Sequence, residues 1–234
     1  IWVDSIYNNM SLDQKIGQLF MPMVFSRKDS KHYTSSLELI KKYHIGGVIF
    51  SLGSPYKQTK WLNSFQKHSK IPLLVGMDAE WGVSMRLDSV MSFPWNMTLG
   101  AIKDTSLIRK IGYRMGIQEK RLGVHISFSP VLDINTNPRN PIIGNRSFGE
   151  SKKLVTNHAI ALMQGHHQAG ILTSGKHFPG HGDTANDSHK TLPILRHDKK
   201  RIKDILKTST YLDTYINQNY IDMLCCLEEK STCS

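Results

Sequence analysis

Apolar and polar positions alternate in blocks along most of the chain. Five short runs are rich in apolar residues and predict β-strands, at 19–25, 48–50, 71–77, 124–132 and 171–174. Strands that are apolar on both faces are typical of a parallel sheet with both faces covered. The stretches between these runs carry apolar residues at helical spacing, most clearly at 154–163. The pattern therefore predicts an α/β fold.

Local signals predict where several helices begin and end. Ser11 and Gln14 have the spacing of a capping box, and Asp104 is a suitable N-cap for a later helix. Another helix is predicted to end near His44, where a pair of glycines follows. Gly170 is placed to end the helix that precedes the fifth strand.

Two parallel folds fit five such β/α units: a doubly wound sheet and a (β/α)8 barrel. No glycine-rich dinucleotide or phosphate-binding pattern follows the first strand, which disfavours the doubly wound sheet. Polar side chains follow the third, fourth and fifth strands, where barrel enzymes build their sites: Asp78 and Glu80, Asp133 and Asn135, and Lys176 and His177. The sequence therefore predicts a TIM-type barrel that is incomplete, with about five units present and the last strands missing.

The composition is that of a globular domain. The chain has 234 residues, of which 39% are hydrophobic and 21% charged, enough for one large domain with a buried core. No apolar run reaches the ~18–20 residues that a membrane-spanning helix needs. No signal-peptide pattern opens the chain. Because it begins with Ile1 rather than Met, we expect its native N-terminus to lie further upstream.

The net charge of +11 raises the possibility of a nucleic-acid partner, but the lysines are scattered. They cluster only at 199–201, and no RNA-binding, zinc-finger or helix-turn-helix signature is present. A solvated lysine-rich surface is therefore the interpretation, with no nucleic-acid partner. The three cysteines lie within the last ten residues and suggest neither a disulfide framework nor a zinc site.

The segment 176–189 concentrates the most chemistry, with three His, two Asp and one Lys in fourteen residues. In one interpretation, Asp187 and His189 form a dyad in which the carboxylate orients the imidazole for proton transfer. In a second, His177, His181, Asp183 and His189 hold a metal, although their spacing matches no common zinc motif and Lys176 would oppose a cation. A third interpretation is a polar loop that only caps the barrel.

The Lys-His-Phe-Pro-Gly-His-Gly sequence of 176–182, followed by Asp-Ser-His at 187–189, resembles the signature loop of family 3 glycoside hydrolases. The resemblance is to their β-N-acetylhexosaminidase branch, similar to NagZ. Further segments resemble the family in the same order, at 10–19, 78–87, 93–101, 130–135 and 145–149. Ala79 and Trp81 depart from the family's Asp-x-Glu-Gly-Gly segment. The resemblance covers roughly residues 1–205.

The resemblance implies a role for each matching residue. Asp78 accepts hydrogen bonds from sugar hydroxyls, since the two oxygens of a carboxylate can accept from two hydroxyls at once. The other substrate-binding residues implied are Arg86, Arg146, Lys176 and His177. His189 is the acid/base and Asp187 its partner.

The implied activity is retaining hydrolysis of terminal β-linked N-acetylhexosamine, with a carbohydrate as the partner and no cofactor or metal. The Asp-Ser-His sequence favours a hexosaminidase over a β-glucosidase or xylosidase. The resemblance also implies a bacterial role in peptidoglycan turnover or glycan scavenging. The expected compartment is the periplasm or cell envelope, with the cytoplasm as the alternative.

One part of the family pattern is missing. The family's nucleophile is an Asp in a Ser-Asp-x-Leu-like segment, which these residues do not contain; Asp213 and Asp222 are the late candidates. Residues 206–234 form an atypical, cysteine-rich tail, and we hypothesise that the reading frame is interrupted near residue 205. Two alternatives to an active glycosidase follow: a truncated remnant that at most binds sugar, and a metal-dependent hydrolase.

Overall fold

The computed structural model describes residues 2–178 and 180–185. This part of the chain forms two compact units. The first unit comprises residues 2–94, 109–129 and 163–174, and the second comprises 95–108, 130–162 and the described residues from 175 onward. The predicted tail at 206–234 and the dyad of Asp187 and His189 lie outside the described residues.

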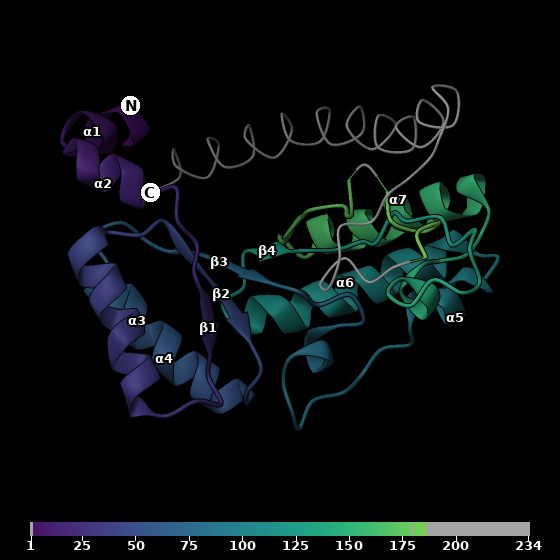
Figure 1. Cartoon of the computed structure of the whole chain (residues 1–234), viewed down its shortest axis with the longest axis horizontal. Helices are drawn as coiled ribbons and strands as arrows, with labels where there is room; N and C mark the ends of the chain where they lie inside the picture. The colour runs from purple at the N-terminus through teal and green to yellow at the C-terminus, as the bar shows by residue number, and fades with distance from the viewer. Residues whose placement is uncertain (1, 179, 186–234) are drawn as a thin grey trace. The chain divides into compact units, whose positions relative to one another are not determined.

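The first unit contains a five-stranded parallel sheet in the order β1-β2-β3-β4-β5 (Figure 1). The strands are β1 (Met23–Phe25), β2 (Gly47–Ser51), β3 (Leu74–Met77), β4 (Ile126–Ser127) and β5 (Leu172–Thr173). The predicted number and parallel arrangement of the strands are confirmed. The predicted lengths are too long for the first, third, fourth and fifth strands, because only the residues in register with a neighbouring strand join the ladder.

Five of the helices in the described residues lie where the sequence predicts them, whereas the helices at 2–8 and 96–100 were not predicted. The helices are α1 (Trp2–Asn8), α2 (Leu12–Gly17), α3 (Ser30–Tyr43), α4 (Pro55–His68), α5 (Asn96–Gly100), α6 (Thr105–Arg121) and α7 (Lys152–Gln168), with 3₁₀ helices η1 (Val83–Met85) and η2 (Gly144–Arg146). Ser11 and Gln14 form the predicted capping box, and the Asp104 carboxylate accepts the Ser106 N–H. None of the helices in the described residues is long and apolar enough to span a bilayer.

The core of the first unit lies where α3 and α4 pack beside β1–β3 (Figure 1). Phe50 of β2, Ile40 of α3 and Phe65 of α4 are completely buried there. The ring of Tyr33 stacks on Phe65, with 5.4 Å between the centroids. These contacts place the end of β3, and hence Asp78, on a rigid support.

The core of the second unit forms between α5 and the part of α7 that belongs to it. Leu99, Phe148 and Leu162 are almost completely buried. His158 of α7 lies against the Phe148 ring, and its Nε2 is 2.9 Å from the carbonyl oxygen of Ile102. A Cβ on Gly100 would come within 1.8 Å of the Phe148 carbonyl oxygen, so this approach requires glycine.

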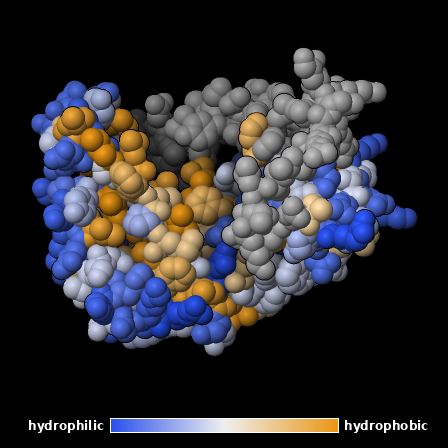
Figure 2. All heavy atoms as spheres, in the orientation of Figure 1, coloured by the Kyte–Doolittle hydropathy of each residue, from blue (hydrophilic) through white to orange (hydrophobic). Residues whose placement is uncertain are grey.

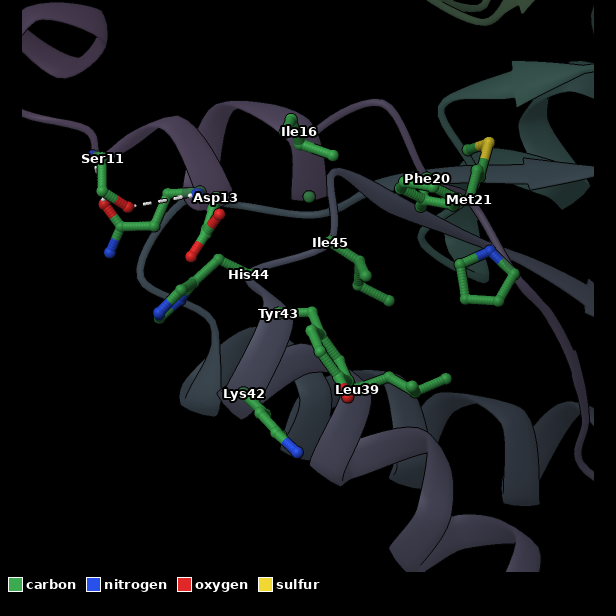
Figure 3. Close-up of a pocket in the computed structure, with 13 residues that line it drawn as sticks. Ser11, Asp13, Ile16, Phe20, Met21, Leu39, Lys42, Tyr43, His44 and Ile45 are labelled. Carbon is green, nitrogen blue, oxygen red and sulfur yellow. Dashed lines mark hydrogen bonds between the residues drawn. The ribbon is translucent and has the colours of Figure 1, made fainter.

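The sheet is not closed within the described residues, because β1 pairs only with β2 and β5 only with β4. This confirms the prediction of an incomplete barrel. Next to α2 and α3 lies a hollow of about 900 Å³, and Ile16, Leu39 and Tyr43 face it (Figure 3). Figure 2 shows hydrophobic residues gathered on this face of the first unit. In a closed barrel such a surface is covered by further strands and helices.

We expect the 234-residue chain alone to self-associate and to bind an apolar dye, because it exposes this surface to water. Leu19 is 83% exposed and Phe20 is 59% exposed, and Phe20 lines the hollow. Replacing both residues with serine should lower dye binding and shift sedimentation toward the monomer at little cost in folding free energy. Tyr56→Ser, at an exposed position on α4 away from the hollow, serves as the control. A sharply melting monomer that binds no dye would contradict this expectation.

Two histidines of the first unit accept hydrogen bonds from strand backbone. His125 Nδ1 accepts the Val75 N–H at 3.0 Å, and His32 Nε2 accepts the Phe25 N–H at 3.1 Å. Burial lowers the pKa of His125. Burial and then the nearby Lys28 lower the pKa of His32, against a smaller opposite effect of Asp29. Both bonds require an unprotonated ring nitrogen.

The free energy of unfolding of the first unit should therefore fall as the pH is lowered. A histidine pKa below its usual 6.5 means that the unfolded state binds the proton more readily. The contribution is complete above pH 6.5 and is lost as the pH falls through the lower folded pKa values. Urea unfolding at several pH values measures this change, and His125→Gln should remove part of it. His68→Gln, on the exposed end of α4, should behave like the parent chain.

Candidate active site

An ion pair follows strand β3 in the first unit. Asp78 comes directly after Met77, the last residue of β3, and Arg86 comes directly after η1. Arg86 Nη2 donates to Asp78 Oδ2 at 2.6 Å. The two side chains are 23% and 24% exposed, so the pair is held by its surroundings and still reaches solvent. The Arg86 carbonyl also accepts the Gly53 N–H, which fixes the backbone that carries the guanidinium.

The second unit holds a separate group of polar residues around a buried carboxylate. The Asp133 side chain has no exposed surface, whereas the His177 side chain is 35% exposed. Asp133 Oδ2 lies 2.6 Å from His177 Nδ1. Asp133 Oδ1 accepts the His181 backbone N–H at 2.6 Å. One carboxylate therefore binds the signature loop at two points.

The loop is also held by backbone bonds next to these residues. Lys176 forms a parallel bridge with Val131, and its N–H donates to the Pro130 carbonyl. Gly182 packs against Ile134 so closely that a Cβ would lie 1.9 Å from the Ile134 carbonyl oxygen. The loop thus follows the backbone after Pro130 at van der Waals distance, which requires glycine at this position.

Arg146, the last residue of η2, approaches the other edge of the His177 ring. Its Nη2 lies 3.3 Å from His177 Nε2. Its Nη1 donates to the Ile142 carbonyl at 3.2 Å, and Asn96 Nδ2 donates to the Arg146 carbonyl at 2.8 Å. The guanidinium is therefore oriented by its own backbone turn and by α5.

Asn140 joins the two segments of this group. Its Oδ1 accepts the backbone N–H groups of Ile142 and Ile143, at 2.9 and 2.7 Å. Its Nδ2 donates to the His181 carbonyl at 2.7 Å and to Thr184 Oγ1 at 3.2 Å. The Thr184 hydroxyl also bonds His181 Nδ1. A single buried amide thus connects the turn before Arg146 to the signature loop.

The predicted substrate-binding residues fall into two groups. Asp78 and Arg86 are in contact in the first unit. Arg146 and His177 are in contact in the second unit, where Lys176 is the neighbour of His177 in the chain. Within the described part of the chain, no three His, Cys, Asp or Glu side chains form a group that could hold a metal ion.

The contacts of Asp133 were not predicted from the sequence. Asp133 was expected among the polar residues after the fourth strand, without a role of its own. Asn140 and Thr184 were also missed. The available signal was the match of 130–135 to a family segment, which marks Asp133 without naming its partners.

A comparison with protein families matches residues 11–223 to the model described as the glycosyl hydrolase family 3 N-terminal domain. The chain belongs to glycoside hydrolase family 3. This confirms the predicted family and its TIM-type barrel. The match runs past residue 205, where the sequence analysis placed the end of the resemblance.

Curated family 3 relatives share about a third of their residues with the chain over the aligned region. Beta-hexosaminidase A from Pseudoalteromonas piscicida is 36% identical over 178 residues, which are 70% of this chain and 30% of the relative. Beta-hexosaminidase LpqI from Mycobacterium tuberculosis is 32% identical over 186 residues, or 77% of this chain and 46% of the relative. These names confirm the predicted branch. The chain spans 30–49% of the length of the curated relatives it matches.

Solved family 3 structures have the same fold. A β-N-acetylglucosaminidase from Paenibacillus superposes with a TM-score of 0.76 at 37% identity, covering 83% of this chain and 38% of that one. A β-glucoside phosphorylase, BglX, has a TM-score of 0.83 at 26% identity, covering 90% of this chain and 38% of that one. The second structure is named as a phosphorylase.

Proposed function

We propose that this chain forms part of a retaining glycosidase that removes terminal β-linked N-acetylhexosamine from glycans or peptidoglycan fragments. The observation that carries the proposal is the membership in family 3 together with relatives of 30–37% identity that are mostly named beta-hexosaminidases. The proposed substrate is a carbohydrate, and the proposed chemistry requires no cofactor or metal.

The described polar residues fit the binding of a sugar. A carboxylate with two oxygens can accept hydrogen bonds from neighbouring hydroxyls, and the pairing with Arg86 keeps Asp78 oriented for this. Arg146 and Lys176 carry positive charges that donate hydrogen bonds without titrating near neutral pH. His177, more than a third exposed at the side chain, offers a further polar contact. In this proposal the five residues bind substrate and do not transfer protons.

Proton transfer is assigned to His189, with Asp187 as its partner. The carboxylate would accept one ring N–H and stabilise the imidazolium, which gives its other N–H proton to the leaving alcohol. The neutral imidazole that remains would then take a proton from the water that attacks the glycosyl-enzyme. Most glycosidases use two carboxylates, and a histidine acid/base is an exception to that rule. Because residues 1–234 contain no Ser-Asp-x-Leu segment, we propose that the nucleophile comes from outside them.

Release of nitrophenol from a nitrophenyl β-N-acetylglucosaminide tests the proposal. The purified chain is compared with the same chain joined to the remaining barrel residues of the Paenibacillus relative. Turnover by the joined protein that Asp78→Ala abolishes would support the assigned site. Turnover by the 234 residues alone would place the nucleophile within them, with Asp222 as the first candidate. Failure of a folded joined protein to turn over would favour a remnant that at most binds sugar.

A second candidate is phosphorolysis, which the similarity to the β-glucoside phosphorylase favours. Phosphate would then replace water as the acceptor of the glycosyl group. Adding inorganic phosphate to the same assay distinguishes the two, since a phosphorylase releases a sugar 1-phosphate. Free N-acetylhexosamine as the sole sugar product, at any phosphate concentration, would exclude phosphorolysis.

A further inference from the structure

We propose that Asp133 is a positioning residue that sets the tautomer of His177, so that its Nε2 lone pair faces the Arg146 guanidinium. The inference concerns residues of the second unit only. It deepens the proposed function, because His177 is one of the proposed sugar-binding residues. Its test does not depend on turnover.

Because Asp133 is buried, its carboxylate oxygens need hydrogen-bond donors from the protein rather than from water. Its side chain is completely buried, and its two oxygens are each 2.6 Å from a nitrogen, one on the His177 ring and one in the His181 backbone. The Asp133 carbonyl accepts the Ser147 hydroxyl at 2.6 Å, which holds the residue on its backbone side. A buried carboxylate without such donors would be strongly disfavoured. Asp133 is therefore held in one orientation.

The position of the ring proton follows from the partners on both edges. An ionised carboxylate accepts hydrogen bonds and cannot donate them, so His177 Nδ1 must carry the hydrogen. A guanidinium donates and cannot accept, so the 3.3 Å contact with Arg146 Nη2 requires a lone pair on His177 Nε2. Both edges thus specify the same form, the Nδ1–H tautomer. This is the role that a buried partner commonly plays for a functional histidine.

The arrangement links the buried carboxylate to the exposed face of the site. The His177 ring transmits the orientation of Asp133 to Arg146, and the same carboxylate holds the loop backbone at His181. Asp133 itself has no surface through which it could touch a substrate. It would act on binding through His177 and Arg146.

Asp133→Asn is the sharpest variant, because it keeps the size and removes one of the two acceptors. If the amide oxygen of the new side chain faces His181, its NH₂ group faces His177 Nδ1. The ring must then accept at Nδ1 and carry its hydrogen on Nε2, which puts a donor against the Arg146 donor. If the amide oxygen faces His177 instead, the NH₂ group opposes the His181 N–H. The variant therefore cannot satisfy both original contacts.

Long-range proton–nitrogen correlation spectra of the histidine rings, recorded above pH 7 on the full chain, measure the tautomer. We expect His177 to be protonated at Nδ1 in the parent chain and to become protonated at Nε2, wholly or in part, in Asp133→Asn. Asp183→Asn makes the same chemical change in the same loop and should leave the His177 tautomer as it is. His177→Gln identifies the signal.

Two results would overturn the proposal. One is a parent chain in which His177 carries its hydrogen on Nε2, a result that requires no variant to fold. The other is a folded Asp133→Asn chain in which both the His177 tautomer and the His181 backbone amide signal are unchanged, because the new side chain cannot satisfy both contacts. A folded joined protein that does not turn over, with the expected tautomers in the chain, would contradict the proposed function and leave the role of Asp133 supported, so the two failures are distinguishable.

Discussion

Replacing His189 with alanine is expected to lower kcat/KM by about 10²–10⁴-fold for a disaccharide of N-acetylglucosamine, measured on the joined protein that turns over. The alcohol that leaves a disaccharide needs a proton in the transition state, and His189 is proposed to supply it. Asp187→Asn should cause a loss of the same kind, because the imidazole then loses its orienting carboxylate. Kinetics with purified variants measure both effects.

The choice of leaving group separates a chemical role from a structural one. The dinitrophenolate of a dinitrophenyl glycoside leaves as a stable anion and needs no proton. Removal of the acid should therefore slow the formation of the glycosyl-enzyme much less for this substrate. His68→Ala, at an exposed site on α4, is the matched control and should leave all rates unchanged. An equal loss for both kinds of substrate would show that His189 does not act as the acid.

Asp78→Ala is expected to lower kcat/KM by about 10²–10⁴-fold, because two charged hydrogen bonds to sugar hydroxyls of about 1.5–3 kcal/mol each are lost. The loss should also appear as weaker binding of free N-acetylglucosamine, which calorimetry or ligand-observed NMR can measure without turnover. The fold should persist, since Arg86 still reaches solvent and water can replace the lost carboxylate as its partner.

Asp88→Ala provides the matched control for this prediction. Asp88 is an exposed carboxylate in the same segment, and its backbone N–H bond to the Gly53 carbonyl does not involve the side chain. Binding and rates should be unaffected by this change. If Asp78→Ala and Asp88→Ala weakened sugar binding equally, the loss would come from removing one negative charge rather than specific hydrogen bonds. The assignment of Asp78 as a hydroxyl acceptor would then fail.

The local features of the chain could be predicted from the sequence because short-range interactions decide them. The capping box of Ser11 and Gln14 and the start of α6 after Asp104 depend on residues within three positions of each other. The alternation of apolar runs and helical stripes was enough for the α/β class and five parallel strands. The family itself followed from the signature loop at 176–189.

Tertiary structure alone decided the strand lengths and the partners within the site. A residue joins a parallel ladder only where a neighbouring strand offers a partner in register, and this left β4 with two of the nine residues predicted as a strand. Asp133 meets His177 and His181 across 44 and 48 positions of the chain. A hydrogen bond between residues so far apart in the chain leaves no pattern in the local sequence, because it forms only when the fold buries both partners together. The sequence by itself determined which polar residues follow the strands. The folding of the loop onto the backbone after Pro130 decided which of them form hydrogen bonds with one another.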